Sequence, residues 1–157
     1  MEQTFDYIKD AGGIETEAKY PYHAADQKCV SDPAKFEAVK VTDYTDVRPN
    51  DCNDLIVSIA KQPVSVSIAA SSMQFYKNGV FHNIFCGTGL NHGVVAVGYG
   101  HDATVKKDFW IVRNSWGAGW GEDVYIRMDR EKNSFHGICG ICMYGSYPEV
   151  TSPLITF

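Results

Sequence analysis

The sequence predicts an α+β protein, with a short helical segment at the front and a β-rich body from about residue 37 onward. The first 12 residues have apolar side chains at helical spacing, whereas the later chain has alternating or continuous apolar runs bounded by glycines. A chain of 157 residues has the length of one ordinary domain and can bury a substantial core. We therefore expect one β-dominated core rather than two independent domains.

The first helix is expected at the very start of the chain. Met1, Phe5 and Ile8 recur at helical spacing, and the pair Gly12-Gly13 supplies a stop. The chain therefore opens inside an amphipathic helix.

Residues 13–36 read as loop-rich, and a second helix is expected over residues 50–61. Leu55 and Ile59 are apolar and lie four residues apart, and Pro63 closes the pattern. This helix is the last one that the sequence predicts.

The remaining segments have the patterns of strands and turns. Val64, Val66 and Ile68 alternate with small polar or neutral residues, which is typical of a half-buried strand. Other apolar runs are continuous and are separated by glycine-rich turns. The strands are predicted at residues 64–68, 93–99, 109–112 and 124–128.

The composition excludes several classes of function. The net charge of −5 argues against a nucleic-acid surface, which needs clustered Lys and Arg. The longest apolar runs are too short to span a bilayer, and residues 1–12 lack the pattern of a secretory signal. We therefore expect neither a nucleic-acid partner nor membrane insertion.

One histidine and one asparagine lie at the ends of two predicted strands. His92 opens the apolar run 93–97, and Asn114 ends the run 109–113. If these strands pair, the amide oxygen of Asn114 can accept the ring N–H of His92 and leave the other ring nitrogen to serve a nucleophile. A histidine at a strand start is more often structural, and Asn-Ser-Trp-Gly alone can be a simple turn.

Longer segments around these residues indicate a family. The strings GLNHGVVAVGYG, FWIVRNSWGAGWGE and PVSVSIAASSMQFYKNGVF closely resemble the papain-like cysteine proteases, a family that includes the papain group and the cathepsins. Similar features in DYIKDAGGIETEAKYPY and HGICGICMYGSYPEV extend the resemblance from residue 1 to about 150. The chain is identified as a member of this family.

The resemblance implies a papain-like α+β fold that is truncated. It implies a remnant of the helical left domain over residues 1–40 and a β-rich, antiparallel, barrel-like right domain over residues 41–150. Residues 151–157 are expected to form a C-terminal tail. The family is lysosomal, vacuolar or secreted, so one of these locations is implied.

The resemblance also implies roles for four residues of the site. His92 matches the base that accepts the thiol proton and later protonates the leaving amine, and Asn114 matches the residue that orients its ring. Trp116 matches the indole that shields this hydrogen bond from water. Trp120 matches the second aromatic residue of the motif, near the primed side of the cleft. No cofactor and no metal are implied.

A pocket for the substrate side chain two positions before the cleaved bond is implied as well. Its borders match Ser67, Leu90, Asn91, Gly93 and Tyr144. Tyr144 is bulky for the pocket floor, so it would shorten the pocket and disfavour a large aromatic side chain. The expected substrate is a polypeptide.

The nucleophilic part of the family motif has no match in this sequence. The segment Cys-Gly-Ser-Cys-Trp and the Gln of the oxyanion hole do not occur in the 157 residues, and an oxyanion hole is usually a large part of transition-state stabilisation. Met1 resembles an internal Met of a longer enzyme, so the chain corresponds to the C-terminal two-thirds. We expect it to be inactive alone.

Three origins of such a chain are open. It can be a shortened gene product, the light half of a cut two-chain enzyme, or a non-catalytic relative used as a binding or structural subunit, with a protein partner covering the opened domain face. Processing would have no reason to leave a Met at the cut, which favours the shortened product.

The five cysteines are odd in number, so at least one thiol is free. Cys86 and Cys139 match a family disulfide, whereas Cys29 matches a cysteine whose partner would lie in the missing segment. Cys52 and Cys142 have no assigned partner. The spacing of Cys139 and Cys142 is that of half a zinc site, but no second half is visible.

Overall fold

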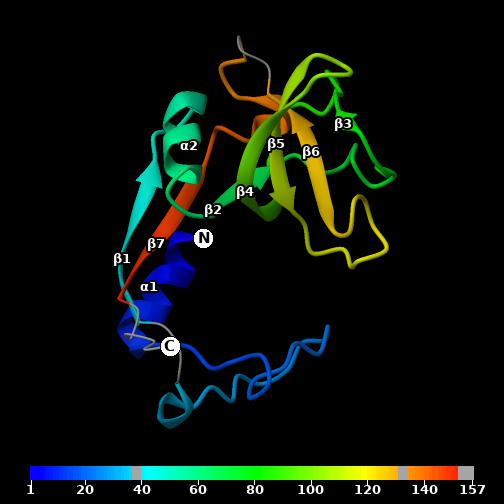
Figure 1. The fold of residues 1–157 in the computed structure, drawn as a ribbon. Coiled ribbons are helices and arrows are strands. Elements are labelled where there is room, and N and C mark those ends of the chain that lie inside the picture. Colours follow the sequence, from blue (N-terminus) through cyan, green and yellow to red (C-terminus); the bar gives the residue numbers. More distant parts are fainter. Residues whose placement is uncertain (37–39, 131–133, 152–157) are drawn as a thin grey trace, which may run out of the picture. The chain divides into compact units, whose positions relative to one another are not determined.

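The computed structural model describes residues 1–36, 40–130 and 134–151. The chain divides into two compact units: one comprises Met1–Thr45 with the chain from Pro148 onward, and the other comprises Asp46–Tyr147. The division near residue 40 that the resemblance implies stays a prediction. The elements, shown in Figure 1, are α1 (Glu2–Ala11), η1 (Pro33–Lys35), β1 (Lys40–Val47), α2 (Cys52–Ile59), β2 (Val64–Ile68), β3 (Val80–Phe81), β4 (His92–Asp102), β5 (Lys107–Arg113), β6 (Tyr125–Asp129), η2 (Ile138–Gly140) and β7 (Gly145–Thr151).

The first unit contains α1, which ends as the sequence predicts. Gly12 adopts a left-handed conformation (φ 85°), and its N–H donates to the Ile8 carbonyl over 3.1 Å. Glycine takes this conformation without a steric cost, so it terminates helices readily. The ring of Phe5 in α1 contacts the ring of Tyr44 in β1, with centroids 6.0 Å apart.

In the second unit, α2 is two residues shorter at each end than predicted. The Asp51 side chain accepts hydrogen bonds from the N–H groups of Asn53 and Asp54, both at 3.0 Å, and this N-cap sets the first residue of the helix. Leu55 and Ile59 are buried on one face. The apolar spacing therefore predicted the buried face, whereas the cap decided where the helix begins.

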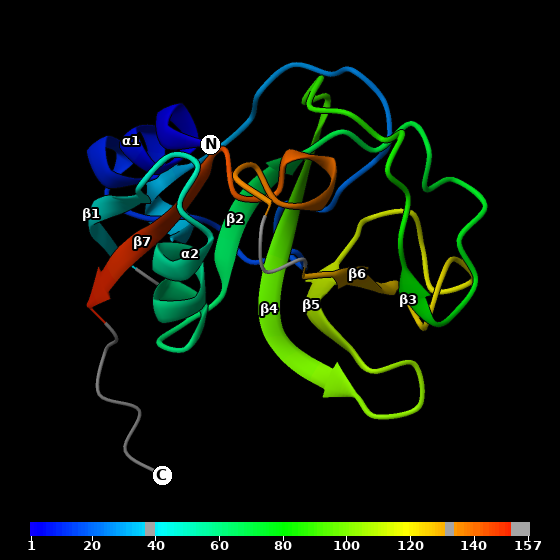
Figure 2. The ribbon, with the colours of Figure 1, turned by 90° about the horizontal axis from the view of Figure 1, so that it is seen from above.

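The strands form an open sheet in the order β1-β7-β2-β4-β5-β6-β3. The pairs β2–β4, β2–β7, β4–β5 and β5–β6 are antiparallel, whereas β3 pairs with β6 in parallel. In Figure 2, β4 follows a long curve beside β2 and β5. The four predicted strands correspond to β2, β4, β5 and β6, while β1, β3 and β7 were not predicted individually.

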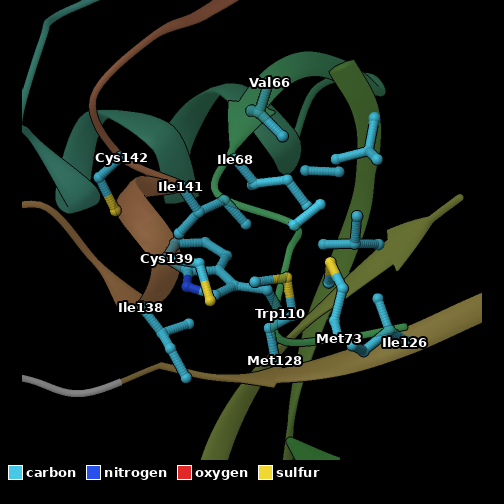
Figure 3. Close-up of a cluster of buried hydrophobic side chains, with 14 of the residues drawn as sticks. Val66, Ile68, Met73, Trp110, Ile126, Met128, Ile138, Cys139, Ile141 and Cys142 are labelled. Atoms are coloured by element: carbon cyan, nitrogen blue, oxygen red, sulfur yellow. The ribbon is translucent and has the colours of Figure 1, made fainter. Parts of the chain in front are cut away.

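The core of the second unit lies around Trp110, which β5 contributes and which is fully buried. Figure 3 shows Ile138, Cys139 and Ile141 facing the indole from η2 and the residue after it. Met73, from the loop after β2, and apolar side chains from the sheet complete the cluster. Burial of this cluster fixes the sheet whose ends carry the site residues.

Two disulfides are present in the second unit. Cys86 is bonded to Cys139, and Cys52 is bonded to Cys142. Cys29, in the first unit, is a free and exposed thiol. Because the sulfurs of Cys139 and Cys142 are bonded elsewhere, they are not thiolate ligands for zinc.

Among the described residues, no helix is long and apolar enough to cross a membrane. Thr151 is the last residue of β7, and residues 152–157 of the expected tail lie outside the described residues.

Candidate active site

The pairing of two strands brings His92 and Asn114 together. His92 is the first residue of β4, Asn114 directly follows β5, and the two strands are antiparallel with Val95 opposite Arg113. The start of β4 and the end of β5 therefore lie at the same end of the sheet. There His92 Nε2 lies 2.8 Å from Asn114 Oδ1.

This contact identifies the tautomer of the imidazole. An amide oxygen only accepts hydrogen bonds, so Nε2 carries the proton and donates it. The N–H of Ser115 donates to the same oxygen over 2.8 Å. A flipped amide would place its NH2 group against both donors, which fixes the assignment of Oδ1. In the neutral ring, Nδ1 is therefore the nitrogen with the free lone pair.

Asn114 is itself held rigidly. Its side chain is 2% exposed, and its backbone N–H donates to the Val124 carbonyl over 3.0 Å. Removal of water strengthens the hydrogen bond that Asn114 makes with His92. The ring of His92 is thus oriented by a buried acceptor whose backbone is hydrogen-bonded to Val124.

Two tryptophans cover one side of this hydrogen bond. The Trp116 ring stacks on the His92 ring, with centroids 5.1 Å apart and planes at 25°. Trp120 packs edge-on against Trp116, also at 5.1 Å, and its indole N–H donates to the Gln74 carbonyl over 3.0 Å. Trp116 is 38% exposed, whereas Trp120 is buried, so Trp120 supports Trp116 from the protein side.

Tyr76 packs against Trp120 and so supports this aromatic stack. Its ring centroid lies 5.7 Å from that of Trp120, and its hydroxyl donates to the Gly79 carbonyl over 2.6 Å. Burial raises the pKa of Tyr76. The phenol therefore stays protonated and keeps its role as a donor.

Glu122, in the turn before β6, is paired with Arg127 of β6 and is hydrogen-bonded to the turn before β3. Arg127 donates to both carboxylate oxygens of Glu122 over 2.8 and 2.9 Å, and the N–H of Gly79 donates to Glu122 over 2.8 Å. The Arg127 side chain lowers the pKa of Glu122, and Glu122 in turn raises the pKa of Arg127. This pair fixes the loops on which Tyr76 and Trp120 lie.

A hollow of about 190 Å³ opens beside His92. The sequence reasoning missed three of its residues, all of which come from the loop after β2. A signal was available, because Ile68 at the end of β2 pairs with His92, so that residues shortly after Ile68 must lie beside the imidazole. The hollow is lined by Ala70, Ser71, Gln74, Asn91, His92 and Trp116.

Asn91 is the predicted pocket residue that lines this hollow. Its side-chain oxygen accepts from the Ala70 N–H over 2.9 Å, and its NH2 group donates to the Ser71 hydroxyl over 3.0 Å. Asn91 thereby ties the loop after β2 to the residue next to His92. Its side chain shapes the wall of the hollow.

The other predicted pocket residues gather around β2. Ser67 pairs with Gly93, and the Ser67 N–H donates to the Tyr144 carbonyl over 3.1 Å. Leu90 lies against Gly140, where an added Cβ would be 2.7 Å from a Leu90 methyl carbon. Tyr144 is 54% exposed and leaves its ring open to the solvent side.

Solved structures define the class of this fold. Bromelain from Ananas comosus, solved in complex with the E64 inhibitor, is 42% identical and superposes with a TM-score of 0.87, over 94% of this chain and 67% of bromelain. The recombinant stem bromelain precursor gives a TM-score of 0.89 at 41% identity, over 96% of this chain and 49% of the precursor. The chain therefore has a papain-like fold.

The family assignment follows from the sequence comparison. The model described as "Papain family cysteine protease" matches residues 1–149, and the chain belongs to this family. The oryzain beta chain of Oryza sativa subsp. japonica is 50% identical over 94% of this chain. A KDEL-tailed cysteine endopeptidase of Arabidopsis thaliana is 51% identical over the same share. The chain spans 32% and 41%, respectively, of these two relatives.

Proposed function

We propose that this chain is the part of a papain-like cysteine endopeptidase that carries the acid and base of the reaction, and that it hydrolyses peptide bonds only when a nucleophilic Cys is supplied from outside its 157 residues. The observation that carries the proposal is the 2.8 Å hydrogen bond from His92 Nε2 to the buried Asn114.

The geometry supports a defined course of proton transfer. Nδ1 of His92 accepts the proton of a thiol, and the resulting thiolate attacks the carbonyl carbon of the peptide bond. The protonated ring then donates from Nδ1 to the leaving amine, and a water molecule hydrolyses the thioester. Asn114 holds the ring in place throughout, because its oxygen accepts from Nε2 in both protonation states.

The states of the five cysteines support a nucleophile from outside this chain. Cys52, Cys86, Cys139 and Cys142 are all in disulfides, so none of them can form a thiolate. Cys29 is free, but it lies on a loop of the first unit rather than at the start of a helix. An oxyanion-hole Gln is likewise expected from outside these 157 residues.

The direct test is an activity assay of the purified chain. With a peptide substrate and a thiol-directed active-site label, we expect no turnover from the chain alone. Co-expression with a polypeptide that carries the Cys-Gly-Ser-Cys-Trp segment and the oxyanion Gln should restore turnover. His92→Ala should then lower kcat/KM by about 10³-fold or more.

His101→Ala is the matched control, since His101 is an exposed histidine whose ring bonds to Asp108 at 2.7 Å. This variant should keep full activity. Turnover by the chain alone that disappears in His92→Ala would contradict the external nucleophile. Restored turnover that survives His92→Ala would overturn the proposed role of the imidazole.

The alternative function is that of a non-catalytic binding or structural subunit. It is favoured by an apolar hollow of about 300 Å³ in the first unit, lined in part by Tyr7, Ile14, Tyr20 and Phe36. A protein partner that covers this face would bury Tyr7 and Ile14, which are exposed. Stoichiometric co-purification of a partner, lost in Tyr7→Glu but kept in His92→Ala, would support this function.

A further inference from the structure

The bend that leads into β3 contains the pair Asn78-Gly79 (Figure 1). It is the only asparagine in the 157 residues that is followed by glycine. Asn78 is exposed, and its carboxamide has no hydrogen-bond partner among the described residues. Asparagine is chemically labile, and an exposed carboxamide without a partner is free to approach the backbone nitrogen of the next residue.

The conformation of Gly79 leaves that nitrogen accessible. Gly79 is left-handed, with φ 85°, and a Cβ added to it would meet no atom within 4 Å. Glycine adopts this conformation without a steric cost and lets other groups approach the backbone closely. No side chain therefore shields the Gly79 nitrogen from the carboxamide of Asn78.

These two residues can react with each other and with water. The Gly79 nitrogen loses its proton to water and attacks Cγ of Asn78, which forms a new C–N bond. The bond from Cγ to the side-chain nitrogen then breaks, and this nitrogen takes up a proton and leaves as ammonia. Water opens the cyclic imide at either carbonyl and gives aspartate or isoaspartate. One water molecule is consumed, one ammonia is released, and nothing is oxidised or reduced.

The carboxylate of Glu122 holds the same nitrogen. The Gly79 N–H donates to Glu122 Oε1 over 2.8 Å, and Arg127 binds both oxygens of this carboxylate. Arg127 lowers the pKa of Glu122, so the carboxylate is ionised at neutral pH. A negative charge at this distance disfavours loss of the Gly79 proton. The hydrogen bond must also open before the nitrogen can attack Asn78.

The carbonyl of Gly79 is held as well. It accepts from the Tyr76 hydroxyl over 2.6 Å, and the Tyr76 ring packs against Trp120. Isoaspartate at position 78 would lengthen the backbone by one methylene and place a new charge next to Glu122. The two hydrogen bonds of Gly79 could not both keep their geometry, so Tyr76 and Trp120 would lose part of their support.

We propose that Asn78 is a site of spontaneous deamidation, and that Glu122 sets the rate of this reaction by holding the Gly79 N–H. The modification needs only water as co-reactant and does not depend on the proposed peptidase function. It is a slow chemical change in the loop that supports the aromatic stack beside His92.

The experiment follows deamidation of the purified chain during incubation at neutral pH. Peptide mass spectrometry measures replacement of NH2 by OH at each asparagine, and fragment ions distinguish isoaspartate from aspartate. In the wild type, we expect Asn78 to convert before any other asparagine. Glu122→Ala should speed this conversion at least about tenfold, the factor that corresponds to loss of a hydrogen bond to a charged group.

Asp102→Ala is the matched control, because Asp102 is the other carboxylate that binds Arg127, at 3.1 Å, and does not bind Gly79. Its rate at Asn78 should stay within about twofold of the wild type. Earlier conversion of another asparagine in the wild type would overturn the assignment of the site. An unchanged or slower rate in Glu122→Ala would overturn the role of the carboxylate.

Asn114 reports on loss of the fold in the same samples. It precedes Ser115, but its side chain is buried, and the Ser115 N–H donates to its oxygen over 2.8 Å. Acceleration at Asn78 alone supports the proposal. If Glu122→Ala accelerates both sites, Glu122→Gln replaces it, because Gln keeps an acceptor oxygen and removes the charge. An acceleration of at least about threefold at Asn78 is then expected, and an unchanged rate would contradict the proposal.

Discussion

The neighbours of Asn114 orient its side chain and shield it from water. Its oxygen receives two donors, its backbone is tied to Val124, and water is excluded from it. The sequence predicted its partner, because strand patterns before and after the turn place His92 and Asn114 at the same sheet end. It could not predict the Cys52–Cys142 bond, since the two residues are 90 positions apart and no local pattern relates them.

Val124 carries backbone strain next to this site. The sequence predicted the strand from Val124 onward, but Val124 has φ 75°, and β6 begins only at Tyr125. A β-branched residue in the left-handed region is a genuine outlier. Its N–H donates to the Trp120 carbonyl and its carbonyl accepts from Asn114, both at 3.0 Å, so the surroundings hold it in this conformation.

Val124→Gly should stabilise the protein by about 1 kcal/mol, because relief of about 1 to 2 kcal/mol of left-handed strain exceeds the added entropy of the unfolded chain. The midpoint of thermal unfolding should rise by about 2 to 4 °C. Val105→Gly is the control, since Val105 lies in a turn and its φ is not positive. That variant should not be stabilised, and a lower midpoint for Val124→Gly would contradict the strain.

The elements that the sequence predicted best are those with strong apolar patterns. β2, β4 and β5 alternate or run continuously through the core, and their burial follows from that pattern. β3 has only two residues and is defined by its partner β6, so no local pattern could indicate it. β1 and β7 are rich in polar residues, and tertiary pairing rather than composition makes them strands.

The stability of the loops between these elements depends on the ionised state of Glu122. The folded state lowers the pKa of Glu122, mainly through the Arg127 side chain, so the unfolded chain takes up its proton at a higher pH. The pair therefore stabilises the fold above the unfolded value of about 4.3, and this contribution is lost as the pH falls through the folded value. Asp102, whose pKa is lowered mainly by the Val105 N–H, adds to the same acid dependence.

Glu122→Gln should be less stable than the wild type at pH 7, and the difference should shrink as the pH falls below about 4. Urea unfolding of both proteins between pH 3 and pH 7 measures this difference. Glu2→Gln serves as the control, because Glu2 is exposed in α1. A difference that is constant across the pH range would contradict the electrostatic role of Glu122.

The two units of the molecule differ in how many of their apolar side chains are buried. No residue of α1 is buried, whereas the second unit contains a continuous core from Val47 to Cys142. Local opening requires less free energy where few apolar contacts are lost. The first unit should therefore open more easily than the sheet.

Hydrogen exchange in the unmodified chain tests this difference. The α1 amides should exchange at least about 100-fold faster than those of the β4–β5 ladder. The amides of α2 are an internal control, because α2 is also short but is packed on the core through Leu55 and Ile59. Equal protection of α1 and β4–β5 would show that the units unfold together.

The aromatic stack at the site also has an optical consequence. The three tryptophans occupy distinct environments, since Trp110 is fully buried, Trp120 is nearly so, and Trp116 is the one that solvent reaches freely. Trp116 therefore dominates the long-wavelength edge of the intrinsic emission and is the one most open to collisional quenchers. Because its ring lies on His92, the protein contains a built-in fluorophore that reports on anything entering the hollow.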